Sequence, residues 1–182
     1  MNAVTTDLPG VVVLEPARHG DDRGWFCETW NQRTWADLGL QRNWVQDNHS
    51  RSGDGVLRGL HFQRGAQAQD KLVRVVVGAA FDVVVDLRRD SPTFGRWCGV
   101  QLDADSGRQI FIPAGCAHGF LSLREGSELL YKCSAFYDPA SERGLAWDDP
   151  HVGIVWPRPP HTISARDRSW PRLHAIPVED LA

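Results

Sequence analysis

The sequence predicts an all-β fold, a jelly-roll β-sandwich or barrel with a few short peripheral helices. Three observations favour this fold class. The most apolar stretches are short and rich in β-branched residues, they end near Gly, Pro or Asp, and about ten such segments follow one another at regular spacing. We expect a single domain over residues 1–182, because a chain of 182 residues fits one substantial core.

Four segments are the strongest strand candidates, and six weaker ones complete the pattern. The strong segments are residues 11–14, 72–77, 81–87 and 109–112. The weaker segments are residues 25–30, 44–48, 56–63, 97–102, 119–123 and 129–136. Segment 81–87 is apolar enough to lie inside a sheet, and it follows segment 72–77 closely across Gly78, so a hairpin or a short connection between sheets is expected there.

Residues 31–40 form the only early helix candidate. Asn31 can cap the first turn, Trp35 and Leu38 share one face, and Gly39 can end the helix. From about residue 157 onward the chain is rich in proline, which interrupts regular structure. This part is expected to wrap the domain irregularly, with one or two helical turns.

Charge and cysteine content exclude several classes of protein. Lys and Arg total 20 against 23 Asp and Glu, a net charge of −3, which argues against a broad surface for nucleic acid or an anionic membrane. No apolar run approaches the ~20 residues that span a bilayer, and the first residues lack the features of a signal peptide. We therefore expect a cytoplasmic protein. Its four cysteines form no C-x-x-C pair and are expected to be free and mostly buried.

Segment 55–63 is the first candidate for chemistry. On a regular strand, His61 and Gln63 point to one face with Gly59, whereas Arg58 points to the other. A bulge or bend at Gly59 could bring Arg58 and His61 to one cavity. The alternative is that His61 is a hydrogen-bonded core histidine and Arg58 a solvated charge at a sheet edge.

Two further segments carry polar groups between apolar ones. In segment 112–120, Pro113 and Gly115 predict a turn, and His118 then opens the next strand, either at a cavity mouth or bonded to a nearby backbone carbonyl. In segment 129–139, alternation predicts that Tyr131 and Tyr137 share one face. The alternative is that both rings are buried in the core, with their hydroxyls bound to partners.

A series of motifs resembles one known family. Segments 22–28, 46–50, 56–63, 69–73, 91–95, 113–120, 142–144 and 147–150 follow in the order seen in the dTDP-4-dehydrorhamnose 3,5-epimerases, deoxysugar-nucleotide epimerases of the cupin superfamily. The resemblance runs from about residue 10 to about residue 173. It implies a cupin-like jelly roll, a dTDP-4-keto-6-deoxyhexose as substrate, no cofactor, and a homodimer that exchanges N-terminal strands.

The resemblance also implies catalytic roles. The C4 ketone of the substrate acidifies the C–H bonds at C3 and C5, and inversion needs a base on one face and an acid on the other. His61 matches the general base, Asp167 its partner carboxylate, and Tyr131 the acid. Lys71 matches the cation that stabilises the enolate oxygen. From the residues alone, Lys71 is equally an exposed charge at the start of a strand.

The remaining matched positions are substrate contacts. Arginines suit the diphosphate, short polar groups suit the sugar and ribose, and Tyr137 matches the residue that stacks on thymine. The full set is Arg23, Phe26, Glu28, Gln46, Asp47, Asn48, Arg58, Gln63, His118, Tyr137, Glu142 and Arg166. Strand exchange would place Arg23, Phe26 and Glu28 in the site of the neighbouring subunit.

The chain departs from the family pattern at two positions. Arg166 stands where lysine is more usual, and Cys116 stands where the family has phenylalanine. Loss of that phenyl ring is expected to loosen the sugar pocket.

Three alternatives remain at this point. One is a related epimerase that inverts only C3 or only C5. Another is a metal-dependent cupin, because Pro113, Gly115 and His118 resemble part of that metal motif, although His61 and Gln63 stand where a histidine pair is wanted. The third is a binder of sugar nucleotides without activity, which the presence of His61, Tyr131 and Asp167 disfavours. No metal is expected.

Overall fold

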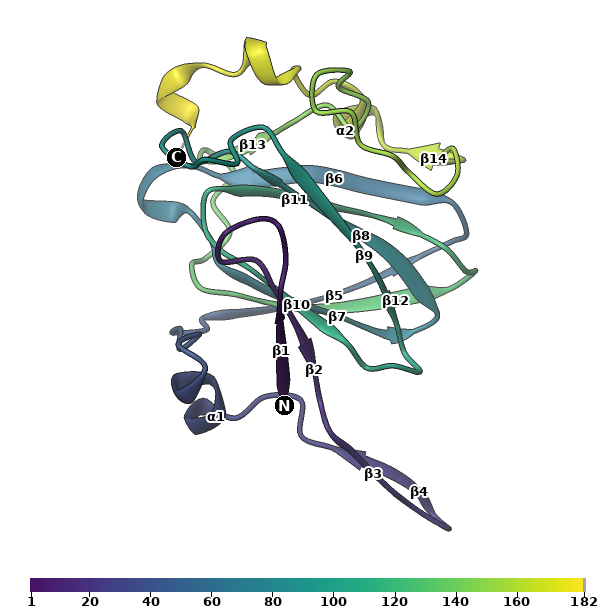
Figure 1. Ribbon diagram of the computed structural model, residues 1–182. Helices are drawn as coiled ribbons and strands as arrows, with labels where there is room; N and C mark the ends of the chain where they lie inside the picture. Colours follow the sequence, from purple (N-terminus) through teal and green to yellow (C-terminus); the bar gives the residue numbers. More distant parts are fainter. Residues whose placement is uncertain (182) are drawn as a thin grey trace.

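Two sheets of six strands face one another in the computed structural model, which describes residues 1–181 (Figure 1). Pairing is antiparallel except where β14 joins β6. This architecture confirms the predicted jelly-roll class.

The first sheet combines the N-terminal strands with strands from the middle of the chain. Its order is β1 (Asn2–Thr5), β2 (Val12–Glu15), β10 (Gln109–Ile112), β7 (Lys71–Val77), β12 (Ser127–Cys133) and β5 (Gln46–Ser52). The second sheet carries the longest buried strands. Its order is β13 (Glu142–Gly144), β6 (Val56–Gln63), β11 (Cys116–Ser122), β8 (Ala79–Asp86) and β9 (Trp97–Asp103), with β14 (Thr162–Ile163) beside β6.

Apolar side chains from the inner faces of both sheets form the main core. This cluster is Leu8, Val11, Val73, Val75, Ala80, Val84, Leu102, Ile110, Ile112, Cys116, Phe120 and Leu129. In β8 every residue except Phe81 is buried, as the apolar density of segment 81–87 predicted. Since side chains alternate along a strand, Asp82 and Asp86 face inward with Val84.

Helix α1 (Gln32–Asp37) covers part of the outer face of the first sheet. Asn31 caps it by accepting hydrogen bonds from the backbone N–H groups of Arg33 and Thr34, as predicted. Trp35 is the buried residue of the helix, and its ring lies 6.4 Å from that of Phe111 on β10. The helix is shorter than residues 31–40 because Leu38 and Gly39 already form its end.

The C-terminal part wraps the outer face of the second sheet, as its proline content predicted. It contains α2 (Ala165–Arg168) and two 3₁₀ turns, Leu173–Ala175 and Val178–Asp180; a third 3₁₀ turn, Gly65–Gln67, follows β6. Its side chains pack on Leu60, Val83 and Val85 of the sheet. Figure 1 shows this yellow segment lying across β6 and β13.

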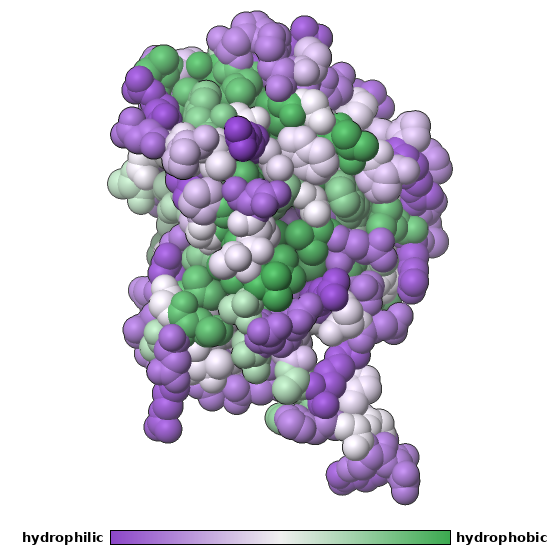
Figure 2. All heavy atoms as spheres, in the orientation of Figure 1, coloured by the Kyte–Doolittle hydropathy of each residue, from purple (hydrophilic) through white to green (hydrophobic). Residues whose placement is uncertain are grey.

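A hairpin of β3 (Arg18–Asp21) and β4 (Gly24–Cys27) projects away from both sheets (Figure 1). Figure 2 shows the same projection standing clear of the body. Trp25 and Phe26 on β4 are 61% and 70% exposed. Large exposed apolar side chains on a projecting arm are typical of a surface that another molecule covers.

Several strand boundaries differ from their predictions. Segment 25–30 contains a strand only as far as Cys27, segment 44–48 starts at Gln46 and continues to Ser52, and segment 129–136 ends at Cys133. Strand β11 begins at Cys116 rather than at residue 119. These boundaries depend on pairing with neighbouring strands, which the local sequence does not contain. Within residues 1–181, no helix has the length and apolar character needed to cross a bilayer.

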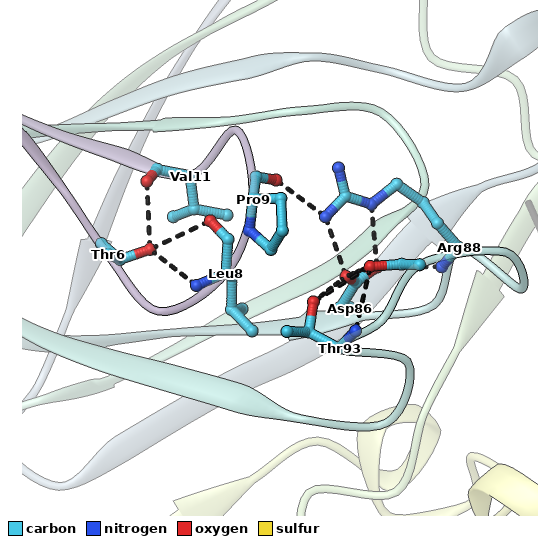
Figure 3. A network of polar contacts seen from close by, with 8 residues as sticks. Thr6, Leu8, Pro9, Val11, Asp86, Arg88 and Thr93 are labelled. Atoms are coloured by element: carbon cyan, nitrogen blue, oxygen red, sulfur yellow. Dashed lines mark hydrogen bonds and ion pairs between the residues drawn. The ribbon is translucent and has the colours of Figure 1, made fainter.

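A buried carboxylate joins the N-terminal turn to the end of β8 (Figure 3). Asp86 is fully buried and accepts hydrogen bonds from Arg88, from Ser91 at 2.5 Å and from Thr93 at 2.6 Å. The Arg88 guanidinium also donates to the carbonyl oxygen of Pro9 at 2.8 Å. Burial by itself would raise the pKa of Asp86, but these hydrogen bonds lower it to about 2.

We predict a pH dependence of stability from this group. Because the pKa of Asp86 is lowered from 3.8 to about 2 in the folded chain, its contribution is fully present above pH 4 and is lost as the pH falls toward 2. Between pH 5 and pH 2 the wild-type protein should lose about 2 kcal/mol more of its free energy of unfolding than Asp86→Asn. Urea unfolding at a series of pH values measures this difference. Parallel curves for the two proteins would contradict it.

Candidate active site

A β-bulge in β6 brings Arg58 and His61 to the same face. His61 lies opposite His118 on β11, and Arg58 lies opposite Phe120, so the pairing shifts by one residue between them. The three-residue spacing from Arg58 to His61 therefore matches a two-residue spacing on β11. The bulge that the sequence allowed at Gly59 is confirmed, and regular alternation is wrong for Arg58.

Glycine is required on both strands at this bulge. Gly59 has a φ of +121°, and a Cβ built on it would lie 2.6 Å from the Cα of Gly119 and 2.8 Å from the carbonyl oxygen of His118. A Cβ on Gly119 would lie 2.6 Å from the carbonyl oxygen of Arg58. The two backbones thus approach more closely than any side chain permits.

His61 forms a pair with Asp167, which α2 supplies. The distance from His61 Nε2 to Asp167 Oδ1 is 2.7 Å, and the backbone N–H of Gly59 donates to Asp167 Oδ2 at 3.2 Å. Ser164 caps α2 by accepting a hydrogen bond from the Asp167 N–H. These contacts fix the carboxylate beside the imidazole, as the resemblance implied.

The state of this pair suits a base. Burial would raise the pKa of Asp167, but the hydrogen bonds from His61 and Gly59 outweigh burial, and the pKa lies below its ordinary value. An ionised carboxylate can only accept, so His61 donates from Nε2. In the neutral ring, Nδ1 then carries the lone pair that could take a proton from a substrate.

A second histidine–carboxylate pair lies next to the first. His118 Nε2 is 2.9 Å from Oδ2 of Asp82, and both side chains are buried. His118 is the third residue of β11, close to the strand start predicted for it, and its partner is a carboxylate rather than a backbone carbonyl. Asp82 is a site residue that the sequence interpretation missed. Its signal was available, because a carboxylate inside a valine-rich strand needs a buried partner.

The facing sheet contributes Lys71, Tyr131 and Cys133. On β12, Tyr131 pairs with Asn48 of β5 on one side and with Val73 of β7 on the other. Cys133 of the same strand lies opposite Lys71. Burial lowers the pKa of Lys71, against the raising effect of the nearby acidic groups. Burial raises the pKa of Tyr131, which keeps its phenol protonated at neutral pH. The Lys71 amine and the Tyr131 phenol therefore come from the sheet opposite the one that carries His61.

The loop after β12 carries Tyr137. Alternation predicted that Tyr137 shares a face with Tyr131, but β12 ends at Cys133, and hydrogen bonds from the loop fix Tyr137 instead. Its N–H donates to Gln46 Oε1 at 2.8 Å, and its hydroxyl donates to Glu142 at 2.7 Å. Gln63 also holds this loop, because its amide donates to two backbone carbonyls and accepts from the N–H of Asp138.

Arg58, Arg166, His61 and Asp167 line an open cavity of about 460 Å³, together with Thr162 and Ser164 among others. This volume is in the range of ligand sites. Arg166 is paired with Glu142, and the Arg58 guanidinium donates to Ser52 at 3.0 Å. Two arginines at one cavity provide the planar donors that a diphosphate requires.

Some of the predicted substrate-binding residues lie away from this cavity. Asp47 points to the outer face of the first sheet, where both its carboxylate oxygens are 3.0 Å from the Lys132 ammonium, whereas its neighbours Gln46 and Asn48 bond to one another. The three residues that the resemblance assigns to a neighbouring subunit, Arg23, Phe26 and Glu28, lie on or just after the projecting hairpin (Figure 1). In a single chain they are separated from His61.

Cys116 does not line the cavity. Its side chain belongs to the main core with Leu8 and Val11 of the N-terminal turn. The structure thus places Cys116 in the core, and the expected loosening of the sugar pocket stays a prediction. All four cysteines are free, and among residues 1–181 no three His, Cys, Asp or Glu side chains are grouped as metal ligands would be.

Comparison with known proteins agrees with this arrangement. A family model described as dTDP-4-dehydrorhamnose 3,5-epimerase matches residues 5–175. The chain belongs to the dTDP-4-dehydrorhamnose 3,5-epimerase family. Its curated relatives include the dTDP-4-dehydrorhamnose 3,5-epimerase of Salmonella typhimurium, which is 51% identical over 176 residues, 95% of this chain and 96% of the relative. The predicted family is thus confirmed.

Solved structures of dTDP-4-dehydrorhamnose 3,5-epimerase family members superpose closely. The dTDP-6-deoxy-D-glucose-3,5-epimerase RmlC of Legionella pneumophila, in complex with dTDP-4-keto-L-rhamnose, gives a TM-score of 0.95 at 42% identity and covers 99% of this chain and 96% of its own. ChmJ, a 3'-monoepimerase from Streptomyces bikiniensis in complex with dTDP-quinovose, gives 0.86 at 37% identity, with coverage of 93% and 86%. Enzymes with one and with two inverted carbons therefore share this fold.

We predict that Gly59→Ala disrupts the bulge. The added Cβ meets backbone atoms that cannot give way, and we expect a loss of about 3 kcal/mol in the free energy of unfolding, together with most activity. Gly39→Ala is the matched control, because Gly39 also has a positive φ (+70°) but a Cβ there meets no atom within 4 Å. The control should lose about 1 kcal/mol. Equal losses in the two variants, measured by denaturant unfolding, would contradict the packing argument.

Proposed function

We propose that this chain inverts C3 and C5 of a dTDP-4-keto-6-deoxyhexose, converting dTDP-4-dehydro-6-deoxyglucose to dTDP-4-dehydro-L-rhamnose. Membership in the 3,5-epimerase family supports the reaction class. The observation that carries the proposal is the pair of opposite walls, with the His61–Asp167 imidazole on one sheet and the Tyr131 phenol on the other. Inversion requires groups of both kinds on opposite faces of the sugar.

In this proposal His61 is the general base. The C4 ketone makes the neighbouring C–H bonds acidic, and Nδ1 of the neutral imidazole removes the proton from C3 or from C5. Asp167 holds the ring and stabilises the imidazolium that forms. The electron pair of the broken C–H bond moves into the enolate, whose negative charge lies on the former ketone oxygen.

Lys71 stabilises that enolate oxygen. A preorganised cation in a site shielded from water interacts most strongly with the oxygen when negative charge develops there. One such group typically lowers the barrier by about 3 kcal/mol. Acidic neighbours, Asp82 and Glu142 among them, partly offset the effect of burial on the pKa of Lys71, which favours its charged form. Lys71 lies opposite Cys133 on β12, two residues from Tyr131.

Tyr131 returns a proton to the face opposite His61. Burial raises the pKa of its phenol, so the group arrives protonated, and the enolate it meets is a strong acceptor. After one carbon is inverted, solvent must reset His61 and Tyr131 before the second carbon reacts.

The nucleotide contacts follow from charge and position. Arg58 and Arg166 bind the diphosphate, with His118 as a further contact held by Asp82. Gln46 and Asn48 bind sugar or ribose oxygens, and Tyr137 stacks on the thymine ring. Glu142 orients Arg166 and the Tyr137 hydroxyl. Gln63 contributes by holding the loop that carries Tyr137, and Asp47 has no role from its outer face in one chain.

We also propose a homodimer that exchanges its hairpins. The exposed Trp25 and Phe26 need an apolar partner, and a second copy of the chain offers the same barrel. Arg23, Phe26 and Glu28 would then complete the site of the partner. A cytoplasmic location fits the four free cysteines, which a reducing compartment maintains. We further propose that residues 1–182 act as a single domain.

An isotope experiment tests the reaction. We predict that the purified protein, given dTDP-4-keto-6-deoxyglucose in heavy water, incorporates deuterium at both C3 and C5, as measured by NMR. His61→Ala should abolish exchange at both carbons, because no other base replaces the imidazole. Tyr131→Phe should retain some exchange but fail to complete inversion, because abstraction does not need the phenol.

His49→Ala is the control for these variants. His49 also pairs with a carboxylate, at 2.9 Å from Glu128, but it is exposed at the edge of the first sheet. It should exchange deuterium at the wild-type rate. Label at one carbon only in the wild-type protein would make this chain a mono-epimerase, and full exchange in His61→Ala would remove His61 from the mechanism.

A complementation experiment tests strand exchange. His61→Ala and Arg23→Ala are each expected to be strongly impaired as pure dimers. If the hairpin completes the partner's site, each mixed dimer contains one intact site, and random co-expression should restore roughly a quarter of wild-type activity. No recovery in verified mixed dimers would show that Arg23 serves the site of its own subunit.

A further inference from the structure

Trp170 contacts two residues of the candidate site but does not line the cavity. It follows α2, which carries Arg166 and Asp167. Its ring meets the His61 imidazole edge to face, with 6.0 Å between centroids and 74° between planes. The Arg166 guanidinium carbon lies 5.4 Å from the centroid of the same indole. One side chain therefore contacts both the proposed base and a proposed diphosphate ligand.

The place of this ring is fixed by a glycine. Gly144 on β13 lies directly opposite His61 on β6. A Cβ on Gly144 would lie only 2.1 Å from Cδ2 of Trp170 and 2.4 Å from its Cγ, so the indole rests on the bare backbone. Trp170 thus fills the cross-strand position next to His61 that a side chain of β13 would otherwise occupy.

The indole N–H of Trp170 is buried without a hydrogen-bond partner in the described part of the chain. Nε1 is shielded from solvent and has no hydrogen-bond acceptor among residues 1–181, which is unusual for a buried donor. Burial raises the pKa of Asp167, and the Trp170 side chain is among the groups, after His61 and Gly59, that lower it. The donor is thus poised beside a carboxylate that already holds the base.

We propose that Trp170 is a positioning residue of the epimerase site, which fixes the His61 ring and the Arg166 guanidinium in one arrangement and offers its N–H as a further donor to Asp167. This inference rests on the proposed function. It also accounts for arginine at position 166, because a planar guanidinium stacks on an indole better than an ammonium does.

The physical consequence is a coupling of binding and proton transfer. A hydrogen bond at Nε2 alone leaves the His61 ring free to tilt about that bond, and the edge of the indole removes this freedom. Arg166 is held on one side by Glu142 and on its face by Trp170. A diphosphate bound to Arg166 is then kept at a constant distance from the base, which a reaction sensitive to small misplacements needs.

Two substitutions separate these roles. Trp170→Ala removes the ring, so KM for dTDP-4-keto-6-deoxyglucose should rise and kcat/KM should fall about tenfold to a hundredfold. Trp170→Phe keeps a face for Arg166 and an edge for His61 but lacks the N–H. Its KM should return to within about twofold of wild type, while deuterium exchange at C3 stays about threefold to tenfold slow.

Trp156→Phe is the matched control. Trp156 is also half-buried and packs edge to face on another ring, that of Phe81, but it lies on the outer face of the second sheet. Its replacement should lower the melting temperature and leave kcat and KM unchanged. If Trp170→Ala does not fold, Trp170→Phe carries the test alone.

The kinetics of Trp170→Phe decide the proposal. A split in Trp170→Phe, with KM preserved and exchange slowed, supports it. Wild-type kcat and KM in a folded Trp170→Phe, or losses in Trp170→Phe that are matched by Trp156→Phe at the same melting temperature, would overturn it. Absence of deuterium incorporation by the wild-type protein is a different result, because it refutes the proposed reaction and not the position of Trp170.

Discussion

The site depends on the close contact between two backbones, at Gly59 on β6 and Gly119 on β11. Only where neither strand carries a side chain can β6 gain one residue against β11. That extra residue turns Arg58 inward beside His61 and leaves the Gly59 N–H directed at Asp167. A steric condition on two glycines thereby determines where the cation, the imidazole and the carboxylate lie relative to one another.

Buried carboxylates then orient the groups that this contact brings together. Asp167 holds His61, Asp82 holds His118, and Asp86 binds Arg88, which in turn reaches the N-terminal turn. Asp167 and Asp82 are removed from water and bind groups from elements distant in the chain, whereas the donors to Asp86 lie within seven residues and Arg88 extends that contact to the N-terminal turn. The free energy of burying these carboxylates therefore depends on the packing of the whole barrel. Stability and preorganisation of the site consequently have the same source.

The fold was largely predictable because its signals are local. Apolar runs bounded by Gly and Pro gave the strands, Asn31 gave the start of α1, and proline gave the irregular C-terminal wrap. The order of the motifs along the chain indicated the family. Site residues were harder, since alternation along single strands misplaced Arg58, and the end of β12 at Cys133 removed Tyr137 from the face of Tyr131.

The sequence by itself determined the all-β class, the resemblance to an epimerase family and the residue types that a proton transfer needs, because each is encoded in short segments. Only the tertiary structure decided that Asp82 partners His118, that Cys116 belongs to the core, and that Trp170 fills the space above Gly144. These are contacts between elements, and they exist only after the two sheets and the C-terminal wrap have packed together.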